Sequence, residues 1–91
     1  MANVEIFTSP YCAFCYRAKS LLRDKRVDFT ELDIIFEPNR RSEMVSRSNG
    51  QSTVPQIFIN SIHIGGCDEL YALEYSGKLD SILEAKSLTK K

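Results

Sequence analysis

The chain has 91 residues, which is enough for one domain with a modest hydrophobic core. Its 43% hydrophobic and 26% charged residues are the proportions of an ordinary globular protein, which excludes collagen-like, disordered and membrane-spanning classes. Twelve basic residues balance twelve acidic ones, so the net charge gives no reason to expect a nucleic acid or an anionic membrane as a partner. We therefore expect a single domain over residues 1–91 that is a monomer.

The first third of the sequence predicts a strand, a helix and a second strand. Residues 3–8 alternate between apolar and polar side chains and are rich in β-formers, as in a strand. Residues 13–25 carry apolar side chains at helical spacing, so the helix begins directly after Cys12. Residues 27–34 are expected to form the second strand. A strand–helix–strand unit of this length implies a parallel pair joined by a right-handed crossover.

The remainder of the sequence predicts two more strands and three more helices. A helix is expected over residues 38–48, and an apolar strand over residues 56–60. Residues 62–64 follow a tight turn and pair with that strand as a hairpin. The last two helices are expected over residues 67–76 and 79–83. The order β-α-β-α-β-β-α-α predicts an α/β protein.

The N-terminal residues lack the basic region and long apolar stretch of a signal or transit peptide. No apolar run approaches the length that spans a membrane. We therefore expect the protein in the cytoplasm. Three cysteines with one close pair make a poor disulfide framework, and in a reducing compartment such a pair is more typical of redox or metal chemistry.

Cys12 and Cys15 form the pattern with the most definite chemistry. A thiolate attacks a disulfide, and a second thiol usually resolves the mixed disulfide that results. Cys12 lies at the expected helix N-terminus, where unpaired backbone N–H groups and the helix dipole stabilise negative charge. Cys15 lies one turn further in, more buried and directed back at Cys12. The spacing therefore predicts Cys12 as the nucleophile and Cys15 as the resolving thiol.

Three segments together resemble the glutaredoxin family. They are Thr8-Ser9-Pro10-Tyr11-Cys12-Ala13-Phe14-Cys15, Thr53-Val54-Pro55-Gln56-Ile57-Phe58 and Gly65-Gly66-Cys67-Asp68-Glu69-Leu70. A C-x-x-C motif alone is a weak signal, but the three segments stand in the family's order and spacing, and the chain is most similar to bacterial dithiol glutaredoxins. The resemblance implies the thioredoxin fold, with a four-stranded mixed sheet flanked by helices.

The resemblance also implies a glutathione site beside the cysteines. In the family the bond that corresponds to Val54-Pro55 is cis, which turns the Val54 backbone toward Cys12, where an extended ligand pairs with it as an added strand. Gly65-Gly66 leads into a helix whose first N–H groups suit a carboxylate, and Asp68 suits the α-amino group of glutathione. Without the cysteines, these residues would indicate only a loop proline and a helix N-terminus. The expected glutathione contacts are Tyr11, Phe14, Arg40, Arg41, Thr53, Val54, Pro55, Gly66, Cys67 and Asp68.

Three positions depart from the family's commonest pattern. Ala13 and Phe14 replace the usual proline and tyrosine between the cysteines, which removes a rigid ring and a phenolic hydroxyl that can contact glutathione. Ser9 stands where many relatives have a lysine. Losing that positive charge weakens the expected stabilisation of the Cys12 thiolate and of the bound glycine carboxylate.

Two metal-binding alternatives remain open. Cys12, Cys15, His63 and Cys67 have the residue types of a zinc site, although a strand–helix–strand unit separates the halves, unlike compact zinc modules. Glutaredoxins without proline between the cysteines resemble those that share a [2Fe–2S] cluster between two protomers, so Ala13 makes a glutathione-ligated cluster carrier the second candidate. We interpret Cys67 itself as a partly buried structural cysteine, and His63 as a residue near the hairpin surface.

The sequence thus predicts a glutathione-dependent thiol–disulfide oxidoreductase. It is expected to reduce protein disulfides and glutathione mixed disulfides through the dithiol, with no bound metal. The expected partners are glutathione and disulfide-bonded or glutathionylated proteins, ribonucleotide reductase being one candidate. A thioredoxin is disfavoured, because its active site would read Trp-Cys-Gly-Pro-Cys.

Overall fold

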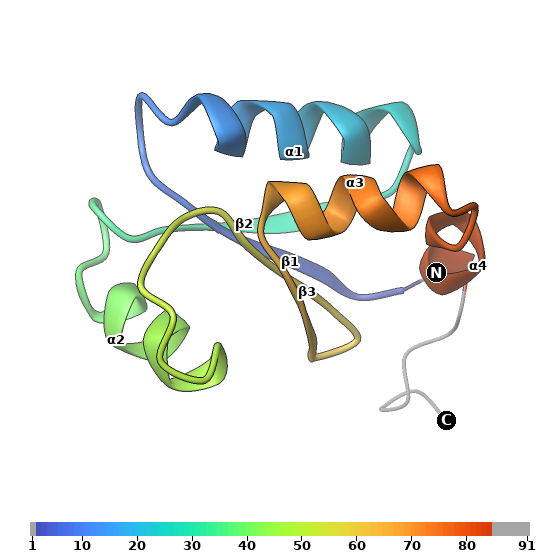
Figure 1. Ribbon diagram of the computed structural model, residues 1–91. Coiled ribbons are helices and arrows are strands. Elements are labelled where there is room, and N and C mark those ends of the chain that lie inside the picture. The colour runs from blue at the N-terminus through green and yellow to red at the C-terminus, as the bar shows by residue number, and fades with distance from the viewer. Residues whose placement is uncertain (1, 85–91) are drawn as a thin grey trace.

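The computed structural model describes residues 2–84, so the ends of the predicted domain lie outside the described residues. Strands and helices follow one another in the predicted order (Figure 1). They are β1 (Val4–Thr8), α1 (Ala13–Asp24), β2 (Phe29–Asp33), α2 (Asn39–Arg47), β3 (Gln56–Ile59), β4 (Ile62–Gly65), α3 (Cys67–Tyr75) and α4 (Leu79–Glu84).

The four strands form one mixed sheet in the order β2-β1-β3-β4. β1 pairs with β2 in parallel and with β3 in antiparallel register, so that Val4 stands between Phe29 and Ile59. β3 and β4 form an antiparallel hairpin whose two turn residues, Asn60 and Ser61, both have positive φ, as a type I′ turn requires. The predicted four-stranded mixed sheet is confirmed.

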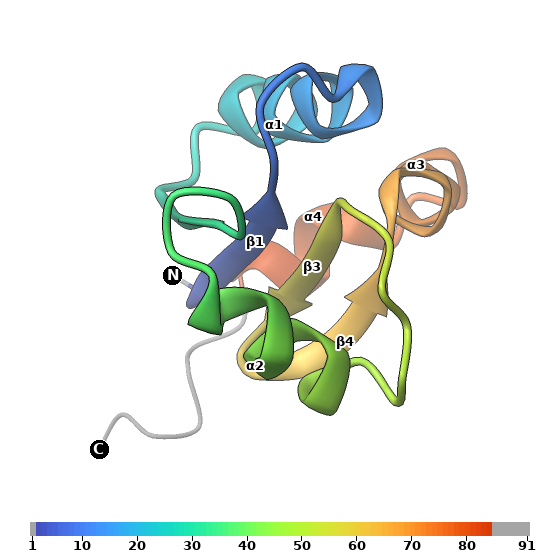
Figure 2. The ribbon, with the colours of Figure 1, turned by 90° about the vertical axis from the view of Figure 1, so that its left-hand side faces the viewer.

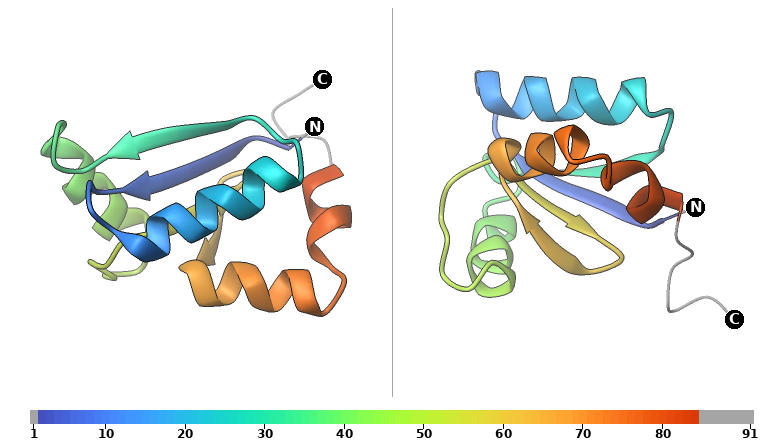
Figure 3. Two further views of the ribbon diagram at one scale, coloured as in Figure 1. Left: turned by 90° about the horizontal axis from the view of Figure 1, so that it is seen from above. Right: turned by 45° about the vertical axis from the view of Figure 1, so that its right-hand side comes forward.

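Helices cover both faces of the sheet. α1 and α3 lie over one face and α2 over the other, with α4 across the end of the first layer (Figures 2 and 3). The period-2 alternation of the strands explains this arrangement, because neighbouring residues point to opposite faces. Ile6 and Ile57 pack under α1 and α3, whereas their neighbours Phe7 and Phe58 pack with Met44 of α2.

Several predicted boundaries move inward in the structure. Residues 27–34 were expected as one strand, but β2 covers only Phe29–Asp33. Val27 and Ile34 are nevertheless buried, which is why the apolar pattern extends past the paired residues. The helix expected from residue 38 begins at Asn39, and Pro38 occupies the N-cap position with φ −58°. These shifts are within the usual uncertainty of helix and strand ends.

The fold brings three distant segments to one end of the sheet. β1 ends there and leads into α1, while the loop before β3 and the start of α3 lie at the same end (Figure 1). Cys12, the loop at residues 53–55 and the start of α3 therefore come together, although more than 50 residues of sequence separate the first from the last.

Candidate active site

Cys12 occupies the N-cap position of α1. Its backbone is extended, with φ −109° and ψ 108°. The backbone N–H of Cys15 donates a hydrogen bond to Cys12 Sγ at 3.1 Å, as it would to the oxygen of an N-cap serine or aspartate. The Cys12 sulfur therefore lies at the N-terminus of α1, in contact with a backbone N–H group of the first helical turn.

Cys15 has a different environment one turn further along α1. Its side chain is 2% exposed. Burial raises the pKa of Cys15 to about 12, and the hydrogen bond with Cys12 and the charge of Cys12 act in the same direction. A backbone hydrogen bond from Ser9 and the charge of Lys19 act in the opposite direction. Cys15 is therefore a neutral thiol at neutral pH.

The loop before β3 faces Cys12. Its Val54-Pro55 peptide bond is cis, as the family resemblance implied. The carbonyl oxygen of Val54 lies 3.9 Å from Cys12 Sγ, within hydrogen-bonding range of a thiol. Pro55 is buried, whereas Thr53 is exposed and Val54 is half-buried. The buried Pro55 side chain thus holds the loop against the protein, while the backbone of Thr53 and Val54 stays accessible to a ligand.

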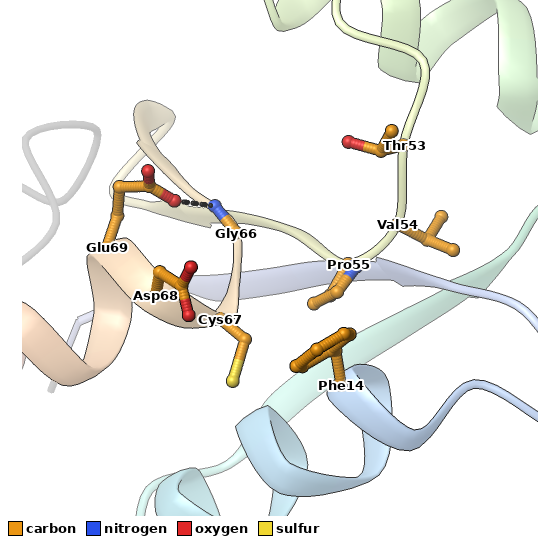
Figure 4. Close-up of a pocket in the computed structure, with 8 residues that line it drawn as sticks. All are labelled: Phe14, Thr53, Val54, Pro55, Gly66, Cys67, Asp68 and Glu69. Atoms are coloured by element: carbon orange, nitrogen blue, oxygen red, sulfur yellow. Dashed lines mark hydrogen bonds between the residues drawn. The ribbon is translucent and has the colours of Figure 1, made fainter.

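A cavity of about 340 Å³ begins at this loop. The ring of Phe14 lies opposite Pro55, and the start of α3 forms another wall (Figure 4). The lining residues are Phe14, Thr53, Val54, Pro55, Gly66, Cys67, Asp68 and Glu69. All of them except Glu69 are among the predicted glutathione contacts. We call this cavity the α3 groove.

Gly66 and Glu69 shape the start of α3. Glu69 Oε1 accepts the backbone N–H of Gly66 at 2.8 Å (Figure 4). A Cβ atom on Gly66 would lie only 3.2 Å from the carbonyl oxygen of Pro55, so glycine allows the two segments to approach closely. Glu69 already accepts the Gly66 N–H group, whereas the N–H groups of Cys67 and Asp68 lie in the first helical turn, where they have no partner within the helix and can bind an anion.

Cys67 lines the α3 groove but has a poorly reactive environment. Its side chain is buried, and burial raises its pKa, although the charge of Arg17 acts in the opposite direction. Asp68 and Cys12 add smaller effects that also raise it. This environment agrees with the interpretation of Cys67 as a structural cysteine.

A second cavity, of about 600 Å³, lies on another side of Cys12. Its wall includes Tyr11, Tyr16 and Phe36, all of which are exposed. Lys19 and Glu31 form an ion pair at its edge, 2.8 Å between Nζ and Oε2. We call this cavity the α1 groove; Cys12 is one of its lining residues.

The two arginines predicted to contact glutathione line neither groove. Arg40 forms ion pairs of 2.8 Å with Glu37 and with Glu43, all within or next to α2. Arg41 is exposed on the same helix. Their contact with glutathione stays a prediction.

The four residues considered for zinc are not brought together as a metal site. Across residues 2–84, no group of three His, Cys, Asp or Glu side chains has an arrangement that could hold a metal ion. His63 instead forms a hydrogen bond of 2.6 Å with Gln56 and is half-buried, deeper than the surface position expected for it.

Within the described residues, no helix has the length and apolar character needed to cross a membrane.

Sequence reasoning missed two features of this end of the sheet. Glu69 stands three residues after the N-cap of α3, which is the spacing of a capping box and could have been recognised. The hydrogen bond between Gln56 and His63 had no sequence signal, because it depends on the register of the β3–β4 hairpin.

A cysteine at a helix N-terminus, a buried second thiol one turn further along and a loop that faces the first thiol define a thiol oxidoreductase of the thioredoxin fold. The glutaredoxin family model matches residues 4–64. Glutaredoxin 3 of Escherichia coli K12 is 56% identical over 84 residues, which cover 92% of this chain and all of that protein. The chain therefore belongs to the glutaredoxin family.

Solved structures agree with this assignment. The solution structure of a Brucella melitensis glutaredoxin superposes with a TM-score of 0.80 at 54% identity, covering 92% of this chain and 90% of that one. A crystal structure of a buckwheat glutaredoxin–glutathione complex gives a TM-score of 0.82 at 29% identity, covering 90% and 76%. The predicted family and thioredoxin fold are confirmed.

Proposed function

We propose that this glutaredoxin is a glutathione-dependent thiol–disulfide oxidoreductase with Cys12 as its nucleophile. The observation that carries the proposal is the α3 groove, which begins at the cis-proline loop facing Cys12 and reaches the first turn of α3. The similarity to a glutaredoxin that binds glutathione, the buckwheat protein, supports the choice of ligand.

Glutathione has an extended backbone, two carboxylates and one α-amino group, and the α3 groove offers a partner for most of them. The backbone N–H and C=O of Val54 suit the peptide portion as an added strand. The free N–H groups of Cys67 and Asp68 suit one carboxylate, and the Asp68 side chain suits the amino group. Bound in this way, the glutathione sulfur would lie beside Cys12.

In the first reaction, the Cys12 thiolate attacks the glutathione sulfur of a mixed disulfide. A new S–S bond joins Cys12 to glutathione, and the substrate sulfur leaves as a thiolate and takes up a proton. A second glutathione thiolate then attacks the sulfur of the bound glutathione. Glutathione disulfide leaves and Cys12 is again a thiolate, so this cycle needs one cysteine.

In the second reaction, the Cys12 thiolate attacks a disulfide of a substrate protein. One substrate sulfur leaves as a thiolate, and the other becomes bonded to Cys12 as a mixed disulfide. Cys15 loses its proton and attacks Cys12 Sγ, which frees the second substrate thiolate and forms a Cys12–Cys15 disulfide. Once Cys12 is bonded to substrate, it no longer carries the negative charge that helps to raise the pKa of Cys15, while Lys19 still lowers it. Two glutathione molecules then reduce the disulfide and become glutathione disulfide.

The surroundings of Cys12 support protein substrates. Five of the seven large apolar side chains exposed in the described part of the chain lie at positions 11–16 and 35–36. These are Tyr11, Phe14, Tyr16, Ile35 and Phe36. Exposed apolar side chains gathered in this way are typical of a surface that contacts a partner, and glutathione is too small to need both grooves. Ribonucleotide reductase remains one candidate substrate, and we propose a monomeric, single-domain cytoplasmic enzyme.

Asp68→Asn should weaken glutathione recognition without affecting the thiol. We expect KM for a glutathione mixed disulfide to rise about two- to fivefold with kcat nearly unchanged, because an exposed ion pair is lost. Steady-state kinetics measure both constants. Asp24→Asn is the matched control, since it removes the same charge at the far end of α1. Equal effects of the two substitutions would contradict the assignment of Asp68.

A glutathione-ligated [2Fe–2S] cluster is the second candidate function. One copy of the chain offers one reactive thiol, Cys12, because Cys15 is buried, so the four thiolates of a cluster would require two copies and two glutathiones. Ala13, which is exposed directly after Cys12, lacks the rigid ring that usually stands there.

Anaerobic reconstitution with iron, sulfide and glutathione should therefore give a coloured dimer, and Ala13→Pro should suppress it. Absorption spectra and size-exclusion chromatography are the measurements. A colourless monomer from the wild-type protein would remove this candidate.

A further inference from the structure

A buried amide stands directly behind the cis-proline loop. Gln56, the first residue of β3, is 1% exposed. Its Nε2 atom donates to the carbonyl oxygen of Thr53 at 3.0 Å and to Oε1 of Gln51 at 3.1 Å, and Thr53 Oγ1 lies at 3.3 Å. A buried polar side chain is costly unless its hydrogen bonds are satisfied. Gln56 thus ties both ends of the segment 51–53 to the sheet.

These contacts fix the orientation of the Gln56 amide. The Thr53 carbonyl oxygen can only accept, so the NH₂ group of Gln56 must face the loop. The Oε1 atom then faces His63 Nε2, which lies 2.6 Å away. Because an amide oxygen cannot donate, His63 must carry a hydrogen on Nε2 and donate it to Gln56. His63 therefore donates a hydrogen bond to Gln56, and Gln56 donates one to Thr53.

The packing of the hairpin holds His63 in place. His63 on β4 stands opposite Phe58 on β3, and the two rings are 5.0 Å apart between centroids. Phe58 in turn contacts Phe7 in an edge arrangement at 5.7 Å and the guanidinium of Arg47 at 4.2 Å. His63 is therefore attached to the rigid core of the sheet, whereas residues 51–53 are exposed.

We propose that His63 and Gln56 are positioning residues for the α3 groove: they hold the backbone of Thr53 and Val54 in the place where glutathione binds. This inference rests on the function proposed above. Thr53 and Val54 form one wall of the groove (Figure 4), and neither His63 nor Gln56 lines it. Their effect on the reaction is therefore indirect, through the loop, and should appear in substrate binding rather than in the reactivity of Cys12.

The test compares His63→Phe with His63→Gln. The phenyl ring keeps the stacking on Phe58 but leaves Gln56 Oε1 without a donor. Glutamine loses the ring but carries an N–H donor at the same number of bonds from Cβ as His63 Nε2. We expect His63→Phe to raise KM for a glutathione mixed disulfide about three- to tenfold, the effect of one hydrogen bond, with kcat changed less than about twofold. His63→Gln should restore most of the affinity.

Two further measurements separate positioning from general destabilisation. The rate of Cys12 alkylation by iodoacetamide does not use the groove, so it should change less than about twofold in His63→Phe. Thermal unfolding shows whether each variant is folded at the assay temperature, and Ile62→Ala, an exposed neighbour on β4, is the control for disturbing the hairpin.

A KM of His63→Phe equal to that of the wild type would overturn the inference, as would equal losses in His63→Phe and His63→Gln. Failure of the proposed function has a different signature: the wild-type protein itself would not turn over the mixed disulfide. Gln56→Leu removes the central amide and should raise KM at least as much as His63→Phe. An unchanged KM in a folded Gln56→Leu protein also contradicts the proposal.

Discussion

Cys12→Ser should lose turnover of both glutathione mixed disulfides and protein disulfides, each by more than about 10³-fold. Cys12 lies at the helix N-terminus with an amide hydrogen bond of 3.1 Å to its sulfur, whereas Cys15 is buried and protonated. A hydroxyl at position 12 has the same place in the fold but cannot act as a thiolate nucleophile. Steady-state turnover with one substrate of each kind is the measurement.

Cys15→Ser is the matched control for that result. It should keep reduction of the glutathione mixed disulfide, because a second glutathione can release Cys12. It should lose most turnover of a protein disulfide. The substrate protein stays bonded to Cys12 until a neighbouring thiol attacks that bond, and Cys15 supplies this thiol at a high effective concentration. The roles assigned to Cys12 and Cys15 would be reversed if Cys15→Ser abolished deglutathionylation and Cys12→Ser spared it.

The second large effect concerns the pH dependence of thiol reactivity. Burial is the main reason that the pKa of Cys15 is raised to about 12, and burial persists when Cys12 is replaced. A raised pKa means that the neutral thiol persists to higher pH. In Cys12→Ser, the alkylation rate of Cys15 should therefore rise about tenfold per pH unit from pH 7 to 9 without levelling off.

In Cys15→Ser, Cys12 should be alkylated at pH 7 at least about a hundredfold faster than Cys15 is in Cys12→Ser. Peptide mass mapping distinguishes both from Cys67, whose pKa is also raised by burial. Free glutathione serves as the reference thiol. A Cys15 rate that levels off near neutral pH would contradict the environment described for it.

The elements could be predicted from the sequence because local signals agreed with tertiary structure. Alternation around Ile6 and the apolar run around Ile57 marked two strands whose faces are both covered. Gly77 and Gly50 stand after helices in backbone conformations with positive φ. The topology of the sheet followed from the family resemblance rather than from periodicity, since pairing of β1 with β3 is not visible in either strand alone.

Sequence motifs pointed to the residues of the candidate site, but not to the residues that hold the loop beside it in place. Cys12 and the first residues of α3 could be found because motif and position coincide. The anchoring of the loop by His63 and Gln56 could not, because it depends on which residues of β3 and β4 stand opposite one another. The exposure of Phe36 beside Cys12 also escaped, since an aromatic residue after a strand is usually expected in the core.

One coupled assay tests the central claim most directly. A glutathione mixed disulfide of a small thiol is supplied with the protein, glutathione, glutathione reductase and NADPH, and a parallel reaction replaces glutathione and its reductase with thioredoxin reductase. We predict NADPH oxidation proportional to protein concentration in the first reaction and none above background in the second. Turnover through thioredoxin reductase without turnover through glutathione would contradict the assignment of the α3 groove as a glutathione site.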